Sequence, residues 1–167
     1  MEAQNEWLDP NSKYKEYRSL QIDKRGSFGE RFFSKVFQDI FVKRIKFEYA
    51  DGDQGDWDLK INGVKFEVKT SSIDVNKKFQ NEGIKIDGDY IGILFLGVTP
   101  NDLYFKFVLK ADIDFSKLHD RKRRGTGSGF KWDFKIDDMI KPDSLEIIKK
   151  EFINTFVGKV QELGKLK

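Results

Sequence analysis

Apolar residues recur at helical spacing in two stretches of this chain. Residues 27–41 carry an apolar residue at every third or fourth position, which predicts a helix with one buried face. These positions are Phe28, Phe32, Phe33, Val36, Phe37, Ile40 and Phe41. A second amphipathic helix is predicted over residues 144–163, with Asp143 or Ser144 as its cap. Its apolar positions are Leu145, Ile148, Phe152, Phe156 and Val160.

Between the two helices the apolar pattern favours strands. We expect strands at 42–49, 56–61, 64–70, 103–109 and 130–136. The run 90–98 is apolar almost throughout, which indicates a strand covered on both faces. Residues 71–89 are polar, and a short helix or an irregular crossover is expected there. The order of elements predicts an α/β fold, a mixed β-sheet flanked by helices.

Asn62 and Gly63 separate two of the predicted strands. Asn-Gly between alternating apolar runs is the strongest short-range signal for a β-hairpin. A two-residue turn at this point pairs Ile61 with Val64 and fixes the register of both strands. The apolar side chains then face the core, and the polar side chains share the other face.

That polar face carries the candidate chemistry. The register sets Asp58 opposite Glu67, with Lys69 two residues further along the same face. Two opposed carboxylates repel each other, whereas a divalent cation between them reverses the sign of the interaction. We therefore consider Asp58, Glu67 and the Val68 carbonyl as ligands of Mg²⁺, with Mn²⁺ as a substitute. Lys69 would orient or help to deprotonate the attacking water.

Glu30 is a carboxylate within the apolar arc of the first helix. A carboxylate at the edge of a buried face needs a partner or a metal ion nearby, so Glu30 is a further candidate for the site. The alternative is an ordinary edge-of-core residue paired with Arg or Lys. The polar face of the hairpin has a similar alternative, a solvated charged surface.

These residues resemble the motif of the PD-(D/E)XK nucleases. The similar segments are Gly55-Asp56-Trp57-Asp58-Leu59, Asn62-Gly63, and Phe66-Glu67-Val68-Lys69-Thr70-Ser71. Glu30 in Gly26-Ser27-Phe28-Gly29-Glu30 resembles the first-helix glutamate of many members. The resemblance spans residues 26–72. No proline precedes Asp58, and Asp56 competes with it for the same role.

The resemblance implies a restriction-endonuclease-like core and Mg²⁺-dependent hydrolysis of phosphodiester bonds that leaves a 5′-phosphate. It also implies that Asp58 and Glu67 are metal ligands, Lys69 is the catalytic lysine and Glu30 is an accessory acid.

Basic residues follow the predicted hairpin and gather near the last strand. We predict that they contact DNA: Lys77, Lys78, Arg121, Lys122, Arg123, Arg124 and Lys131. Contacts with phosphates would supply sequence-independent affinity that weakens with salt, and arginines can also read guanine edges. The alternative is a solvated basic loop. His119 fits a DNA contact or a bystander better than a general base.

Composition narrows the classes of function. A net charge of +3 permits a nucleic-acid partner without requiring one. The absence of cysteine excludes disulfides and thiolate metal sites, and a single histidine excludes a zinc site built on several histidines. Residues 1–21 lack the apolar core of a signal peptide, and the run 90–98 is too short to span a bilayer. We expect a cytoplasmic protein without a membrane partner.

A chain of 167 residues fits one nuclease domain over 1–167. Within it we predict an N-terminal extension or helix (1–25), a catalytic core (26–111), a basic loop with the final strand (112–136) and a C-terminal helix (143–164).

The leading hypothesis is a metal-dependent endonuclease of double-stranded DNA, of the type II restriction kind. A homodimer would suit the two-fold symmetry of duplex DNA. Two alternatives stay open: a Holliday junction resolvase or repair nuclease, and a DNA-binding domain without catalysis.

Overall fold

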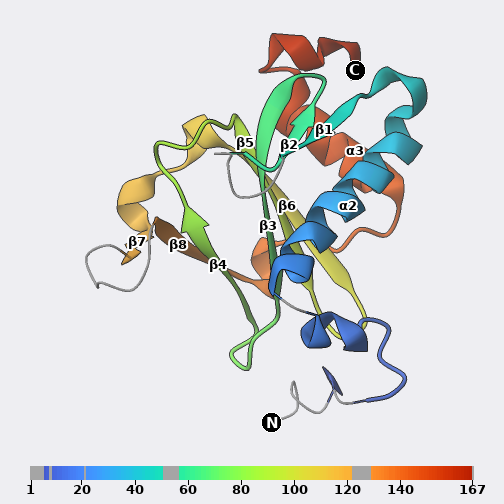
Figure 1. Ribbon diagram of the computed structural model, residues 1–167, viewed down its shortest axis with the longest axis vertical. Helices are drawn as coiled ribbons and strands as arrows, with labels where there is room; N and C mark the ends of the chain where they lie inside the picture. The colour runs from blue at the N-terminus through green and yellow to red at the C-terminus, as the bar shows by residue number, and fades with distance from the viewer. Residues whose placement is uncertain (1–5, 8, 21, 51–56, 122–128, 167) are drawn as a thin grey trace.

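A five-stranded mixed β-sheet forms the centre of the computed structural model, which describes residues 6–7, 9–20, 22–50, 57–121 and 129–166 (Figure 1). Its strand order is β1-β2-β3-β5-β6, and β3 and β5 are its parallel pair. The strands are β1 (Phe47–Tyr49), β2 (Leu59–Ile61), β3 (Val64–Ser72), β5 (Gly92–Val98) and β6 (Leu103–Leu109). Every residue of β5 is buried, as its continuous apolar sequence predicts.

A second, three-stranded antiparallel sheet has the order β4-β8-β7. Its strands are β4 (Lys78–Ile84), β8 (Phe130–Lys135) and β7 (His119–Asp120). The expectation of a helix or an irregular crossover at 71–89 is therefore wrong, because β4 occupies part of that segment. Its buried Asn81 and its Gly83 interrupt the apolar alternation that would have revealed a strand.

Two helices cover one face of the five-stranded sheet, and the second sheet covers the other (Figure 1). On the helix side lie α2 (Ile22–Phe41) and α3 (Leu145–Phe152). The Phe37 and Phe152 rings lie 4.6 Å apart, and Phe152 also packs on Phe66 of β3. On the opposite side, Phe95 of β5 meets Phe134 of β8 at 4.8 Å. The expected mixed sheet with packed helices is confirmed, but the helices cover one face only, and an unexpected second sheet covers the other.

Several element boundaries differ from the predicted ones. Helix α2 begins at Ile22 rather than at residue 27. The predicted helix over 144–163 is α-helical only to Phe152, and continues as a π-helical turn at Ile153–Val157 and a 3-10 helix at Gln161–Leu166. The predicted strand at 42–49 begins with a 3-10 turn at Val42–Arg44 instead. Further 3-10 turns lie at Lys15–Ser19, Lys110–Asp112, Phe115–Lys117 and Ile136–Asp138.

None of the helices formed by the described residues combines the length and the apolar character needed to cross a membrane.

Candidate active site

The β2–β3 hairpin has the register that its sequence predicts. Ile61 pairs with Val64, and the ladder continues to Leu59 and Phe66. The turn residues Asn62 and Gly63 both have positive φ, at 49° and 81°, as a two-residue turn of this kind requires. The apolar side chains of both strands are buried and the polar ones are half-buried, so the predicted division into two faces is confirmed.

The backbone leaves this ladder at Asp58. Its N–H donates to the Phe66 carbonyl at 2.9 Å, so the predicted direct pairing of Asp58 with Glu67 does not form. Oδ2 of Asp58 instead accepts a hydrogen bond from the Val68 N–H at 2.8 Å. The N–H and C=O of one strand residue point to the same side. The Val68 carbonyl is therefore directed to the edge of β3 where the Asp58 carboxylate lies.

Glu67 and Lys69 form an ion pair on the polar face of β3. Glu67 Oε1 lies 2.7 Å from Lys69 Nζ, and the two side chains are only 12% and 20% exposed. Burial raises the pKa of the Glu67 carboxyl, and the nearby Asp58 raises it further against the lowering effect of Lys69. Burial also raises the pKa of Asp58, opposed by the Val68 hydrogen bond and by Lys69. Two partly desolvated carboxylates thus share one electrostatic environment.

Helix α2 carries a third carboxylate, Glu30, that lies within electrostatic range of the two acids. Burial raises the pKa of Glu30 to about 7, with further contributions from Asp58 and then Glu67. The neighbouring Gly29 allows this approach: a Cβ atom there would lie 2.0 Å from Thr70 Oγ1. The helix therefore packs on β3 at a distance that only glycine permits, and the adjacent Glu30 comes within electrostatic range of both acids.

A groove of about 640 Å³ runs along residues 68–72 of β3, where Lys69 lines it, next to the acids rather than around them. Its walls come from the start of α2, the 3-10 turn before it, and β4; its lining residues are Tyr17, Arg25, Gly26, Val68, Lys69, Thr70, Ser71, Ser72, Asp74, Gln80 and Glu82. Within the described part of the chain, the buried Thr70 Oγ1 and Ser71 Oγ have no hydrogen-bond partner.

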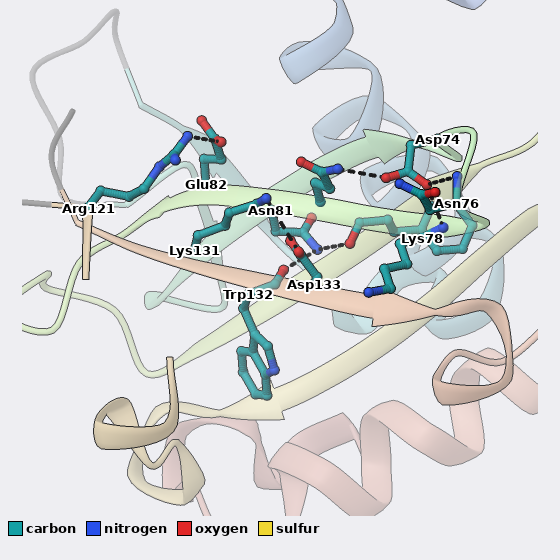
Figure 2. Close-up of polar contacts among 11 residues, drawn as sticks. Asp74, Asn76, Lys78, Asn81, Glu82, Arg121, Lys131, Trp132 and Asp133 are labelled. Carbon is teal, nitrogen blue, oxygen red and sulfur yellow. Dashed lines mark hydrogen bonds and ion pairs between the residues drawn. The ribbon is translucent and has the colours of Figure 1, made fainter. Parts of the chain in front are cut away.

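Those predicted DNA contacts that the structure describes lie around β4, β7 and β8. Lys77 is exposed, and the backbone N–H of its neighbour Lys78 donates to Asp74 Oδ1 at 2.8 Å. Figure 2 shows Arg121 paired with Glu82, and Lys131 Nζ lies 3.4 Å from Asp133 Oδ2. Three further predicted contacts, Lys122, Arg123 and Arg124, lie outside the described residues, as does the competing Asp56.

One charged residue near the acids was missed by sequence reasoning. Lys85 lowers the pKa of both Asp58 and Glu67 through its positive charge. A single lysine in a polar stretch carries no pattern, so the sequence offers no signal that would have identified it.

The acids do not form a complete metal cage by themselves. Among the residues that the structure describes, no three Asp, Glu or His side chains are grouped closely enough to hold a metal ion. A Mg²⁺ ion at Asp58 and Glu67 would take its remaining ligands from a carbonyl, from water and from a substrate phosphate, as this ion commonly does.

No protein-family model matches this chain, and no curated protein matches it in sequence.

Proposed function

We propose that this protein is a Mg²⁺-dependent endonuclease of double-stranded DNA with a restriction-endonuclease-like core. One observation carries the proposal. The half-buried carboxylates of Asp58 and Glu67 lie beside the Lys69 ammonium, at the edge of a strand that lines a polar groove. Acids with perturbed pKa values that cluster with a lysine beside a cleft are typical of catalytic sites.

The acid pair fits a divalent cation better than a structural role. Burial raises the pKa of both carboxyls, and Asp58 raises that of Glu67 further, so the negative charge on each is held at a cost to the folded state. A bound cation offsets that cost. One oxygen of Asp58 bonds to Val68 and one of Glu67 to Lys69, which leaves a second oxygen on each carboxylate for an ion. When bound, Mg²⁺ would lower the pKa of a coordinated water and neutralise charge on the phosphate.

Side chains of the protein can carry out the remaining steps of the hydrolysis. Lys69 holds its ammonium at Glu67 and from there can orient the attacking water. Glu30, with a pKa of about 7, can accept a proton near neutral pH, which is the property that a general base or a proton relay needs. The water oxygen bonds to phosphorus as its proton passes to the relay, and the bond from phosphorus to the 3′ oxygen breaks. The 3′ oxygen takes up a proton from water and leaves as a 3′-hydroxyl, and the phosphate stays on the 5′ end.

Under the same proposal, DNA binds in the groove and contacts the basic residues beside it. Arg121 and Lys131 are already ion-paired, so a phosphate would have to compete with Glu82 and Asp133 for them. A homodimer would present two such sites to the two strands of a duplex.

A nicking assay tests the proposal. The full chain is incubated with supercoiled plasmid and Mg²⁺, with EDTA as the control. Asp58→Ala and Lys69→Ala should abolish cleavage with their circular dichroism unchanged. Two matched controls, Asp39→Ala and Lys150→Ala, remove the same charges at exposed positions of α2 and α3 and should cleave normally. Equal cleavage by all four variants would refute the proposal.

The choice of DNA then separates the alternatives. Cleavage of linear duplex at defined positions supports a restriction-type enzyme, and cleavage restricted to four-way junctions supports a resolvase. DNA binding without Mg²⁺-dependent cleavage supports the non-catalytic domain.

A further inference from the structure

Strand β4 contains a β-bulge at the point where it passes the acids. Its pairing with β8 shifts register between Asn81 and Ile84, and Gly83 within the shift has φ of +69°. Before the bulge, Asn81 is buried and Glu82 is exposed; after it, Ile84 is buried and Lys85 is exposed. Regular alternation would have put residues 81, 83 and 85 on the buried face. The extra residue therefore transfers Lys85 to the face that carries Glu82.

That face of β4 is directed at the candidate active site. Glu82 lines the groove together with Lys69. A Cβ atom built on Gly83 would lie 3.7 Å from Lys69 Nζ, so the bulge itself is next to the lysine of the acid cluster. Bulges are common beside active sites, where they redirect a side chain.

The backbone around Lys85 is held in place from two directions. The hydroxyl of Tyr90 donates to the Lys85 carbonyl at 2.6 Å, and Tyr90 is buried within electrostatic range of Glu67, whose charge helps to raise its pKa. On the other side, Gly129 packs against the bulge: a Cβ atom there would lie 2.9 Å from the Ile84 carbonyl oxygen and 3.1 Å from the Gly83 carbonyl carbon. The backbone that leads to Lys85 is thus held by contacts on both sides.

Lys85 also acts on the acids through its charge. Its ammonium stabilises the ionised forms of both Asp58 and Glu67. Lys69 on β3 also stabilises the ionised acids, and its Nζ forms an ion pair with Glu67 Oε1 at 2.7 Å. The ionised acid pair is therefore stabilised by two cations, Lys69 on β3 and Lys85 directly after β4, and only Lys69 is part of the motif resemblance.

We propose that Lys85 is a second catalytic cation of this site, which contacts the non-bridging oxygens of the scissile phosphate and stabilises the negative charge that develops on them. The inference rests on the proposed nuclease function. Lys85 neither gives nor takes a proton in this role. It acts as a preorganised positive charge at the place where the transition state needs it.

Steady-state cleavage of a labelled duplex with Mg²⁺ tests the inference. Lys85→Met should lower kcat by about 10²-fold, the usual loss when one transition-state contact is removed, and should change KM little. Lys85→Arg should restore most of kcat, because the positive charge returns. Lys150→Ala, which removes an exposed lysine from α3, should match the parent protein. An unchanged kcat in Lys85→Met, or a rise in KM alone, would overturn the inference and leave the nuclease assignment intact.

A binding measurement without DNA gives a second readout. Lys85 repels any cation that approaches Asp58 and Glu67, so Lys85→Met should bind Ca²⁺ more tightly than the parent protein, and Lys150→Ala should not. Equal Ca²⁺ affinity in Lys85→Met and the parent would show that Lys85 lies too far from the acids to act there. If the parent protein cleaves no DNA at all, the proposed function fails and this inference fails with it.

Discussion

The packing of α2 on β3 makes a prediction about two glycines of the same helix. A Cβ atom at Gly29 would lie 2.0 Å from Thr70 Oγ1 and 3.1 Å from Val68 Cγ1, whereas one at Gly26 would meet nothing within 4 Å. Turning the Thr70 side chain would still leave Val68 Cγ1 at 3.1 Å, closer than ordinary van der Waals contact. Gly29→Ala must therefore push the helix from the strand, and Gly26→Ala should not.

The two substitutions differ in stability by the cost of that contact. Alanine is favoured over glycine in a helix by about 1 kcal/mol, and this gain is common to both variants. Overpacking of a close contact costs about 1–3 kcal/mol. The propensity term cancels in the comparison, so Gly29→Ala should be less stable than Gly26→Ala by about 1–3 kcal/mol. For a chain of this size that difference separates the two melting temperatures by roughly 2–12 °C.

Urea unfolding and thermal melts of both variants measure this difference. Thr70→Ala provides the internal check, because it removes the hydroxyl that the new methyl group would strike. That hydroxyl is buried without a partner, so its loss alone should cost little. Gly29→Ala should regain most of its lost stability in combination with Thr70→Ala. If Gly29→Ala is as stable as Gly26→Ala, the helix does not pack on β3 at this point, and the approach of Glu30 to the acids loses its basis.

Three further predictions follow from the site and the core. Glu30 has a pKa of about 7 against an ordinary 4.5, so the folded state holds a proton that the unfolded state releases between these values, and stability falls as the pH rises through this window. Glu30→Gln should remove that fall, as measured by urea unfolding at pH 5 and pH 8, and an equal loss in both proteins would contradict the assignment. Mg²⁺ at 100 times its Kd should stabilise the parent protein by about 2.7 kcal/mol and leave the melting temperature of Asp58→Asn unchanged; equal shifts would show that the ion binds elsewhere. Gly92→Ala would bring a methyl group to 2.9 Å from the Val108 carbonyl oxygen and 2.3 Å from the Phe156 ring. We therefore expect the free energy of unfolding to fall by about 1–3 kcal/mol. Unchanged stability would mean that the π-helical turn packs differently.

Local signals in the sequence were sufficient for the hairpin and the central strand. Asn62-Gly63 fixes a turn type, and the strict alternation around it permits one register, which the structure has. The continuous apolar run at 90–98 can only be accommodated where both faces are covered, and β5 lies between the helices and the second sheet. In both segments the local pattern and the tertiary environment favour the same structure.

In other segments tertiary contacts determine the backbone structure, and the apolar pattern predicts it wrongly. Val42 continues an apolar alternation but has φ of +50° and is 65% exposed, because the chain turns there after α2. Gly83 shifts the alternation within β4, so the strand does not have the regular two-residue period expected from its sequence. The C-terminal apolar spacing continues through Phe156 whether the backbone forms an α- or a π-helical turn, so it cannot locate the end of α3.

The candidate site likewise has one part that the sequence predicts and another that depends on tertiary contacts. The half-buried polar face with Glu67 and Lys69 follows from alternation, whereas the bend at Asp58 depends on the hydrogen bond from Val68, which has no sequence signature. Lys85 enters only through the bulge, and its approach depends on glycine contacts between strands far apart in sequence.

The charges around the acids indicate the order in which ligands would bind. Asp58 and Glu67 carry two negative charges, and the cations that act on both are Lys69 and Lys85. Glu30, with a pKa of about 7, adds roughly half a charge at neutral pH. The free site is therefore close to neutral and has little attraction for a phosphodiester. A divalent cation would give the site an excess of positive charge, which would strengthen the binding of an anionic phosphate. By linkage, DNA would strengthen the binding of the cation by the same factor. This reciprocity would let a site with only two carboxylate ligands use a metal ion, because the substrate would complete its coordination.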